Sequence, residues 1–422
     1  MSAALLTPGL HAAKRRLARL ASTMSFTTPN EVVIVSGART PVGNFQGALK
    51  GFTAPQLGVV AVKKALENGH VSPDLIEEVY MGHVIQGNSG QSPARQVALG
   101  AGLKQTTEAT TINKVCASGM KAITLAAQSI QLGHRSVMIA GGMESMSQAP
   151  YYLPRVNPAF GHVQMKDSLL VDGLWDVYND FHMGMCAEKA AKDHQISRED
   201  QDGHAIQTYR RAEEGWKNGV FLEELAPVEI IDKKGNKTVV AEDEAYKVVK
   251  YDKIPGLKPV FDKNGTVTAA NASALNDGAS AVVLTSAAKA QELGLKPIAK
   301  IISYADAAIA PEDFPLAPTV ALPLALAKAG LKKEDISLFE INEAFSVVIR
   351  ACEKVLGLDP AKVNVNGGAV ALGHAIGNSG CRIVVTLAHA LKPGQYGAAA
   401  VCNGVSAPHF RLGSPCLTYV LF

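Results

Sequence analysis

The chain of 422 residues has no long uninterrupted apolar run. A membrane-spanning helix needs about 20 predominantly apolar residues, and the best candidate, Val320 to Gly330, is far too short. Hydrophobic residues make up 47% of the chain and charged residues 19%, which is an ordinary composition for a globular protein. We therefore expect an extensive core, two or three domains and no embedding in a membrane.

Cysteines are few, and their spacing does not suit a metal. No CxxC pair and no Cys/His cluster is present, so a zinc site is not expected. A long chain bound for a reducing compartment also has little reason to form disulfides. Each cysteine is therefore judged singly, against the general rule that a free cysteine is a small buried hydrophobe. They stand at positions 116, 186, 352, 381, 402 and 416.

The first thirty residues lack acidic side chains, since the first acid is Glu31. Their basic residues can lie on an amphipathic helix over His11 to Leu20, and no apolar core of a secretory signal is present. We interpret residues 1–30 as a mitochondrial presequence, with a floppy basic tail as the alternative, and expect a location in the matrix. Without this segment the net charge falls from +3 to about −1, so the basic pI does not indicate a nucleic-acid partner. The basic residues are Lys14, Arg15, Arg16 and Arg19.

The rest of the chain alternates short β-branched runs with amphipathic stretches. A strand is predicted at Val32 to Val35 and a helix at Ala54 to Glu67, and continued alternation of this kind predicts an α/β fold. Residues 151–276 differ, with a charged helix from Arg198 to about Gly215 and a polar turn at Lys233 to Lys237. We interpret this segment as an insertion that completes a ligand site.

Two segments of the chain echo each other. The Ser-Gly that ends at Gly119 leads through a helical stretch and the strand Ser136 to Ala140 to a predicted turn at Gly141-Gly-Met143. The Ser-Gly that ends at Gly380 leads likewise through a helix and the strand Gly397 to Val401 to Cys402-Asn-Gly404. The spacings nearly match, at 23 residues from Gly119 to Gly142 and 24 from Gly380 to Gly404. The pattern indicates duplication of one supersecondary unit.

Cys116 is the strongest candidate for chemistry. It stands where a strand-like run from Ala109 to Val115 turns into a helix with Gly and Ala. At a helix N-terminus the dipole and the unpaired N–H groups favour the thiolate, the reactive form of cysteine. On this pattern alone, a buried inert cysteine remains the alternative.

Three further segments strengthen this interpretation. They are Asn342-Glu-Ala-Phe345 after the strand Leu338 to Ile341, the glycine-flanked Gly373-His374-Ala-Ile-Gly377, and Cys402-Asn-Gly404. Together with Cys116-Ala-Ser-Gly-Met120, these motifs resemble the thiolase family, in the family's order and near its separations. The resemblance runs from about Glu31 to Gly404 and implies the five-layered αβαβα thiolase fold, a duplicated core with an inserted loop domain.

The resemblance implies the following division of the chain. Residues 1–30 are the presequence, and residues 31–147 form the N-terminal core half, completed by about 277–297. Residues 148–276 form the loop domain that binds coenzyme A. Residues 298–422 form the C-terminal core half with an atypical tail at 405–422.

The resemblance also implies roles for the motif residues. Cys116 would carry an acyl group as a thioester, and Cys402 would be the base, or in reverse the acid, at the substrate carbon. His374 and a water positioned by Asn342 would stabilise the enolate oxygen, and the backbone N–H groups of Cys116 and Gly404 would form a second oxyanion hole. His374 would further help to keep Cys116 ionised.

Two more motifs narrow the resemblance to the family's mitochondrial, acetoacetyl-CoA-specific members: Asp176 to Gly184 and Thr268 to Ser273. These members handle acetyl-CoA, acetoacetyl-CoA and CoA, and the expected assembly is a homotetramer, a dimer of dimers. The implied substrate and CoA contacts are Tyr209, Val248, Val249, Lys250, Lys253, Ser273, His182 and Met183. A potassium ion, the one cofactor implied besides the CoA thioesters, would be held at Tyr209, Ala269, Ala270, Ala272 and Val370.

Two departures from the family pattern stand out. Ala375 replaces a usual proline, which should loosen the loop slightly without altering the imidazole. After Gly404 the family continues with further glycines and a final strand, whereas this chain has Val405, Pro408 and Pro415. A proline cannot donate a hydrogen bond to a sheet ladder. We expect the last strand to be missing or replaced by Cys416 to Phe422.

Two alternatives to this reading stay open. A non-catalytic, thiolase-like protein that binds acyl-CoA or lipid is the first, and it is kept open by the unusual tail. A relative of the ketoacyl synthases is less favoured, because those enzymes use two histidines where this chain offers His374 and Cys402. The chain ends in Val-Leu-Phe rather than in a peroxisomal address.

Overall fold

The computed structural model describes residues 29–155 and 160–403, and the backbone of residues 419–421. Residues 1–28 of the predicted presequence lie outside the described residues. So do Gly404 and residues 405–418 of the predicted tail.

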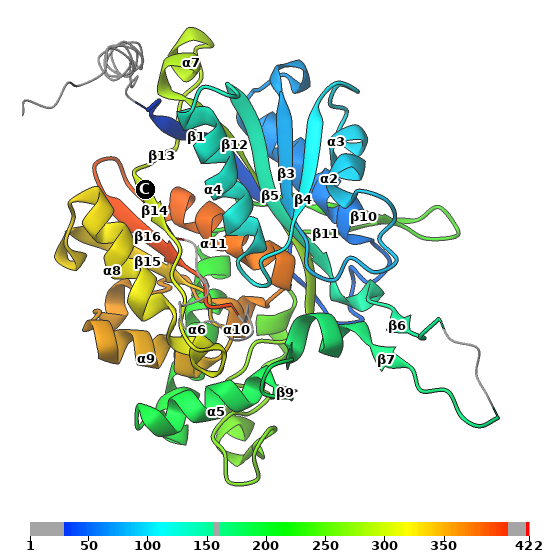
Figure 1. The fold of residues 1–422 in the computed structure, drawn as a ribbon, viewed down its shortest axis with the longest axis vertical. Helices are drawn as coiled ribbons and strands as arrows, with labels where there is room; N and C mark the ends of the chain where they lie inside the picture. Colours follow the sequence, from blue (N-terminus) through cyan, green and yellow to red (C-terminus); the bar gives the residue numbers. More distant parts are fainter. Residues whose placement is uncertain (1–28, 156–159, 404–418, 422) are drawn as a thin grey trace, which may run out of the picture.

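Two β-sheets form the framework of the described chain (Figure 1). In the larger, seven-stranded sheet of the described residues, β3 pairs in parallel with β4 and β5, and the other pairings are antiparallel. Its order is β13 (Ala299–Ile301), β1 (Val32–Arg39), β12 (Asn276–Ser286), β5 (Val137–Ser145), β3 (Glu78–Gly82) and β4 (Glu108–Ile112), with β2 (Gly43–Asn44) beside β12. The smaller sheet has the order β14 (Ser303–Ala305), β17 (Tyr419–Leu421), β16 (Tyr396–Ala400) and β15 (Ile336–Ile341).

Helices lie between the sheets and outside each of them, which gives five layers. Two helices fill the middle layer, α4 (Ser118–Gln131) and α11 (Ile376–Ala390), and they pack against each other and against strands of both sheets. The larger sheet is covered outside by α2 (Ala54–Asn68) and α3 (Pro93–Gly100), and the smaller sheet by α8 (Pro318–Ala329) and α9 (Ser346–Leu356). A short α7 (Ala287–Glu292) follows β12.

Strand side chains are buried on both faces of each sheet, as this layering requires. In β1, Ile34 packs in the middle layer with α4 and α11, whereas its neighbour Val35 packs outside with α2. In β16, Ala399 faces the middle layer and Ala400 faces the outer helices. Successive strand residues point to opposite faces, so strands buried on both sides consist of nearly continuous apolar runs.

The internal echo corresponds to two β-α-β units. In the first, α4 follows β4 and leads into β5, which is parallel to β3, and in the second, α11 leads into β16, which is parallel to β15. The predicted turn at Gly141-Gly-Met143 is wrong, because these residues continue β5 to Ser145 and are buried. Their glycines serve close packing rather than a turn, since a Cβ on Gly142 would meet the Gly377 carbonyl oxygen and lie 2.9 Å from the Asn378 Cα.

One inner strand of the smaller sheet comes from the atypical tail. The backbone of Tyr419 to Leu421 forms β17, which lies antiparallel between β14 and β16. The expectation that Cys416 to Phe422 replaces the final strand is therefore met by three residues of that segment.

The segment between Ser145 and Asn276 carries short hairpins and two longer helices. The polar turn predicted near Lys233 to Lys237 joins β10 to β11, where the Asp232 side chain accepts the Lys234 and Asn236 amides. Helix α6 runs two residues further than predicted, and its start is held by a capping box between Ser197 and Asp200. The elements are β6 (Tyr151–Tyr152), β7 (Lys166–Asp167), β8 (Trp175–Asp176), β9 (Phe181–His182), α5 (Met183–Asp193), α6 (Arg198–Lys217), β10 (Val228–Ile231), β11 (Lys237–Val240) and, further on, α10 (Ala369–Leu372).

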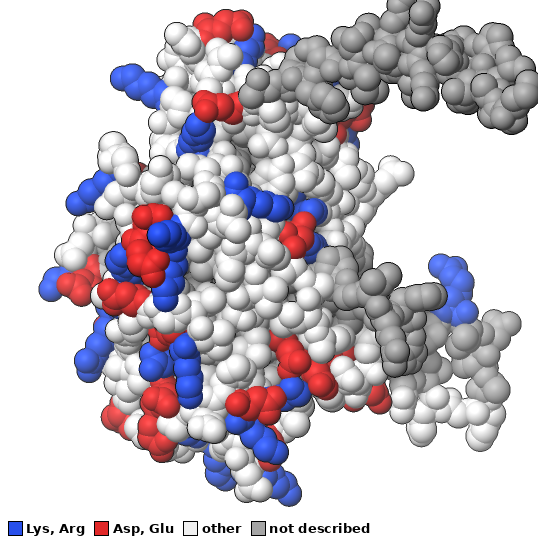
Figure 2. Space-filling view, turned by 60° about the vertical axis from the view of Figure 1, so that its left-hand side comes forward, with Lys and Arg blue, Asp and Glu red and all other residues white. Residues whose placement is uncertain are grey.

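Among the described residues, no helix is both long and apolar enough to cross a membrane. Figure 2 shows basic and acidic side chains interspersed on the face turned forward from the left of Figure 1, where α8 and α9 lie. This face therefore carries no field of a single sign.

The middle layer depends on glycines where α4 crosses α11. A Cβ added to Gly119 would lie 2.8 Å from the Cys381 amide nitrogen and 3.1 Å from the Gly377 carbonyl oxygen. One added to Gly380 would lie 3.2 Å from the Cys116 carbonyl oxygen. The two backbones are thus in direct contact, and the N-terminal ends of both helices meet.

We expect Gly119→Ala to destabilise the protein by about 1–3 kcal/mol, because overpacking forces the helices apart. The change should also lower activity, since the two helix starts separate. Thermal unfolding and an activity assay measure the two effects. The matched control is Gly203→Ala in α6, where no atom lies within 4 Å of the added Cβ; it should be neutral or stabilise by up to about 1 kcal/mol. Equal behaviour of the two variants would contradict the role assigned to the helix contact.

Candidate active site

Cys116 lies in a tight turn just before α4. The strand predicted up to Val115 ends at Ile112, and Cys116 precedes the first helical residue by two positions. Val115 has a φ of +48°, which is unusual for a β-branched residue and costs of order 1–3 kcal/mol. The side chains of Asn113 and Ser118 hold this turn.

Ser118 makes two of the bonds that fix the turn. Its hydroxyl donates to the Val115 carbonyl at 2.6 Å and accepts the Lys114 amide at 2.8 Å. The Asn113 side-chain oxygen accepts the Val115 amide at 3.0 Å. Because the loop is tied at each step, the Cys116 sulfur has a fixed direction, with the side chain 6% exposed.

His374 stands at the start of α11 and faces Cys116. Its Nε2 lies 3.3 Å from the Cys116 Sγ, and its Nδ1 lies 2.6 Å from the Ser379 hydroxyl. Its backbone amide donates to the Asn276 side-chain oxygen at 2.8 Å, and the Asn276 amide group donates to the Gly43 carbonyl at 3.0 Å. The histidine is therefore held by both halves of the chain.

Burial determines the protonation of His374. Removal from water and, as the smaller cause, the nearby Arg382 together lower its pKa to about 3. The imidazole is consequently neutral near pH 7 and has one nitrogen with a free lone pair. A neutral imidazole 3.3 Å from a thiol is placed to accept its proton.

Asn342 and Cys402 are buried, and each interacts with one member of the Cys116–His374 pair. The Asn342 amide group is 3.5 Å from His374 Nε2, and its side-chain oxygen has no hydrogen-bond partner among the described residues. Burial raises the pKa of the Cys402 thiol well above its ordinary value, and the charges of Cys116 and Cys352 add to the effect. Cys402 is therefore a thiol in the resting protein.

A narrow cavity of about 350 Å³ leads to Cys116 and His374. Its wall is mainly apolar and includes Ser273, whose hydroxyl donates to the Ala344 carbonyl at 2.9 Å. The predicted pair His182 and Met183 lies in the wall as well. His182 caps α5 by accepting the Gly184 amide and stacks on Phe261 at 4.6 Å, and burial lowers its pKa.

The other predicted CoA residues do not line this cavity. Val248, Lys250 and Lys253 are exposed on two short turns, and Val249 is half-buried beside them. Tyr209 is buried in α6, and burial raises its pKa to about 12. The structure therefore brings Cys116, His374 and Asn342 together, but it places these five CoA candidates outside the lining of the cavity.

The residues predicted to hold potassium divide into two groups. Tyr209 packs in one cluster with Val370 of α10, and the buried Glu343 carboxylate accepts the Val370 amide at 3.0 Å. The other group comprises Ala269, Ala270 and Ala272, in the loop that follows Thr268. Within this loop, Ala272 forms an isolated antiparallel β-bridge with Phe345.

Sequence reasoning missed three residues that fix the site: Ser379, Asn276 and Glu144. The carboxylate of Glu144 accepts the Val84 and Gly377 amides, each at 3.0 Å, and so ties a loop of the first half to the start of α11. Ser379 had a signal in the sequence, because it is the counterpart of Ser118 in the echo. Asn276 and Glu144 had none, since their partners are backbone groups far away in the chain.

Ala375, at the position of the usual proline, keeps the proline-like geometry. Its φ is −71°, within the range that a proline ring imposes. The helix start that follows His374 is thus in place without the ring. Gly404, the second predicted oxyanion donor, lies outside the described residues.

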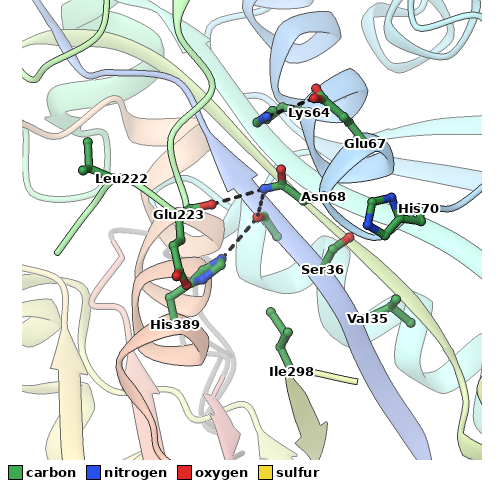
Figure 3. Close-up of a pocket in the computed structure, with 11 residues that line it drawn as sticks. Val35, Ser36, Lys64, Glu67, Asn68, His70, Leu222, Glu223, Ile298 and His389 are labelled. Carbon is green, nitrogen blue, oxygen red and sulfur yellow. Dashed lines mark hydrogen bonds and ion pairs between the residues drawn. The ribbon is translucent and has the colours of Figure 1, made fainter. Parts of the chain in front are cut away.

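A second, more open groove lies elsewhere, lined by Lys64, Glu67 and His389 among others (Figure 3). Several of its polar groups pair with one another or with backbone. Lys64 and Glu67 are 3.3 Å apart, and His389 Nε2 lies 3.2 Å from the Gly37 carbonyl. A nucleophile such as that of the Cys116 site is not among its lining residues.

Known proteins match most of the chain. Residues 32–288 match "Thiolase, N-terminal domain" and residues 295–409 match "Thiolase, C-terminal domain". "Acetyl-CoA acetyltransferase B, mitochondrial" of Xenopus laevis is 56% identical over 384 residues, 90% of this chain and 91% of the relative. "Acetyl-CoA acetyltransferase, mitochondrial" of Mus musculus is 56% identical over 378 residues, 89% of each chain.

Solved structures agree. A thiolase from Ascaris suum in complex with coenzyme A, Acat5, has a TM-score of 0.87 and 47% identity, covering 93% of this chain and 99% of its own. Human mitochondrial 3-ketoacyl-CoA thiolase has a TM-score of 0.88 and 38% identity, covering 94% and 99%. With two echoing halves that present a cysteine and a histidine to one cavity, and with these matches over nearly its whole length, the chain belongs to the thiolase family and has the thiolase fold.

Proposed function

We propose that this chain is an acetyl-CoA acetyltransferase that converts two acetyl-CoA into acetoacetyl-CoA and CoA, and runs the reverse thiolysis, through acetyl-Cys116. The distance of 3.3 Å between Cys116 Sγ and His374 Nε2 at the end of an apolar cavity carries the proposal. Relatives at 54–57% identity bear this enzyme's name, and a thiolase neighbour was solved with coenzyme A.

In the first half-reaction the Cys116 thiol gives its proton to His374 Nε2, and the thiolate attacks the thioester carbonyl. The carbon–sulfur bond to CoA breaks, the departing CoA sulfur takes the proton of the Cys402 thiol, and the acetyl group stays on Cys116. One thioester replaces another of similar energy, so the intermediate is neither a trap nor a barrier. The small cavity, bounded by His182 and Met183, suits a short acyl group.

In the second half-reaction a proton must leave the methyl group of another acetyl-CoA. We assign this step to Cys402, whose thiol has given its proton to the departing CoA in the first half-reaction and is then a thiolate that interacts with the Cys116 site. His374, when protonated, and a water held by Asn342 would stabilise the enolate oxygen, each such donor being worth about 3 kcal/mol. The unpaired Asn342 oxygen, buried within the described residues, supports a bound water there.

Charge near the cavity would hold the phosphates of CoA. Lys250 and Lys253 are exposed, and among the described residues neither forms an ion pair. They are therefore available for an anionic ligand without a basic protein overall. Tyr209, Val248, Val249 and Ser273 complete the proposed contacts.

We further propose a mitochondrial matrix location and a homotetramer. The basic, acid-free first thirty residues and the names of the relatives support the location. The arm of β6 and β7, which extends from the body in Figure 1, supports association, because Tyr151, Leu153 and Met165 are 60–68% exposed on it. A mass of four chains in sedimentation is the expected result, and a monomer would contradict the tetramer.

The alternative of a non-catalytic binding protein has no support from the comparisons. Binding alone does not require a thiol–imidazole pair, whereas acyl transfer does. An enzyme is therefore the function that the site supports best.

Incubation with acetyl-CoA should place an acetyl group on Cys116, because this thiol is the one beside a neutral imidazole. Peptide mass analysis after acid quenching detects the adduct. Cys116→Ala should abolish it and lower acetoacetyl-CoA thiolysis at least about a thousandfold. Cys186→Ala, which removes another buried cysteine, should retain both. Folded wild type without an adduct on Cys116 would sink the proposal.

Potassium should increase activity if it is bound by the carbonyls of Tyr209, Ala269, Ala270, Ala272 and Val370. The bound ion would brace the loop after Thr268, which lies beside the cavity. Initial rates of acetoacetyl-CoA thiolysis in potassium and sodium buffers of equal ionic strength measure the effect. Equal rates in the two buffers would rule out activation by potassium.

The free energy of unfolding should fall as the pH drops below about 6.5, partly because of His374. Unfolded histidine binds a proton near pH 6.5, but folded His374 does so only near pH 3. Between these values the unfolded chain holds more protons, so stability is lost as pH falls. Urea unfolding at pH 7 and pH 5 should show a loss up to about 2 kcal/mol larger in wild type than in His374→Asn. Parallel losses would contradict the low pKa.

A further inference from the structure

Ser379 occupies an unusual position on α11. It is buried in the first turn, and its hydroxyl oxygen lies 2.6 Å from His374 Nδ1 and 3.1 Å from the Ala375 carbonyl oxygen. It is thus the partner of the imidazole nitrogen that points away from Cys116.

The hydrogen bonds of the Ser379 hydroxyl point to the nitrogen that carries the proton. A serine hydroxyl has one hydrogen and two lone pairs. When that hydrogen is donated to the Ala375 carbonyl, the oxygen can only accept from His374, so Nδ1 must be the protonated nitrogen. Nε2 is then left with its lone pair directed at the Cys116 thiol, 3.3 Å away.

A second contact favours the same tautomer. The amide group of Asn342 approaches His374 Nε2 at 3.5 Å, and an amide N–H at that point requires an acceptor. Nε2 with a lone pair is such an acceptor. Both sides of the ring therefore agree on a proton at Nδ1.

We propose that Ser379 is a positioning residue that holds the proton of His374 on Nδ1 and thereby makes Nε2 the base for Cys116. This role rests on the proposed function, in which Cys116 must become a thiolate. Ser379 touches neither substrate nor the reacting sulfur, so it acts only through the imidazole. The arrangement is a chain of three residues from thiol to imidazole to hydroxyl, formally like other nucleophile–base–orienter sets.

The proton transfer balances within this chain. The S–H bond of Cys116 breaks, the proton forms an N–H bond at Nε2, and the sulfur keeps the electron pair. The ring becomes an imidazolium, and its Nδ1–H bond to Ser379 becomes a charge-assisted hydrogen bond, which is stronger than a neutral one. Without the hydroxyl, a buried Nδ1–H of the cation would lose its partner.

The helix itself does not need the hydroxyl. The Ala375 carbonyl already accepts the backbone amides of Asn378 and Ser379, each at 3.0 Å. Loss of the side-chain bond would leave no orphaned acceptor there. Thr124 in α4 offers a matched comparison, because its buried hydroxyl donates to the Met120 carbonyl at 3.1 Å, and no other bond of that hydroxyl is found among the described residues.

Two other titratable groups of the described chain act on the thiol–imidazole pair. Arg382 of α11, which lies more than one turn beyond His374, disfavours a cation on His374 and is itself 3.6 Å from the buried Glu340. Cys402, after β16, interacts with Cys116 and is a thiol because of its burial. Neither supplies a partner for Nδ1, so Ser379 has that function alone among the described residues.

The test follows alkylation of Cys116 by iodoacetamide from pH 6 to pH 10, with the modified peptide quantified by mass. Wild type and Thr124→Val should react alike, with substantial reaction at pH 7. Ser379→Ala should react at least about tenfold more slowly at pH 7, and its pH midpoint should lie a unit or more higher, because the thiolate forms less readily. An unchanged midpoint in folded Ser379→Ala would overturn the proposal.

A double-mutant cycle separates this role from a general loosening of the helix. In the His374→Asn background, Ser379→Ala should cause no further change in the alkylation profile, because its path to Cys116 is gone. An equal shift in both backgrounds would show an effect that bypasses the imidazole and would refute the proposal. Thermal unfolding of each variant is recorded beside the rates.

A measurement on the unmodified protein guards against a variant that does not fold. ¹⁵N NMR of histidine-labelled wild type distinguishes protonated from bare ring nitrogens, with His374→Asn used for assignment. We expect a protonated Nδ1 and a bare Nε2 at pH 7, and the opposite tautomer would overturn the proposal. Alkylation and NMR need no acetyl-CoA, so they succeed or fail independently of the acetyl adduct that tests the proposed function.

Discussion

Direct contact between the backbones of α4 and α11 is the constraint on which the rest of the structure depends. Gly119 and Gly380 leave no room for a side chain, so the helices cross at the shortest distance that two backbones allow. Their N-terminal ends then meet, and Cys116 and His374 come within 3.3 Å although they are far apart in the chain. A larger residue at the crossing would move the Cys116 and His374 side chains apart while the core stayed covered.

The same contact explains the protonation states of the site. Because the middle layer is closed by two sheets, His374, Asn342 and Cys402 are 0–5% exposed, and burial disfavours every charged form. A neutral imidazole and a protonated Cys402 follow from this. Charge can therefore arise only as an ion pair, when a proton moves from the Cys116 thiol to the His374 ring. Because the site is shielded from water, the proton moves between these two side chains rather than to or from the solvent.

Much of this could be read from the sequence, because some features depend on local pattern. The alternation of strands and helices, the echo and the motifs around Cys116 and Asn342 are set by neighbours in the chain, and they predicted the fold. The glycines at 141 and 142 were misread as a turn, because a glycine needed for packing against Gly377 has the same signature as one needed for a bend. Glu144 and Asn276 were invisible, since they bind backbone groups that only the folded chain brings near.

The duplication also places equivalent serines at the two helix starts. Each half places a serine just before the crossing glycine: Ser118 in one, Ser379 in the other. Ser118 binds backbone and fixes the turn that carries a nucleophile, whereas Ser379 binds a ring nitrogen and fixes a base. The two units keep one geometry and differ in what the hydroxyl meets. The same helix-start geometry therefore occurs twice. It presents the Cys116 thiol in one half and the His374 imidazole in the other, and these are the two partners of the proposed proton transfer.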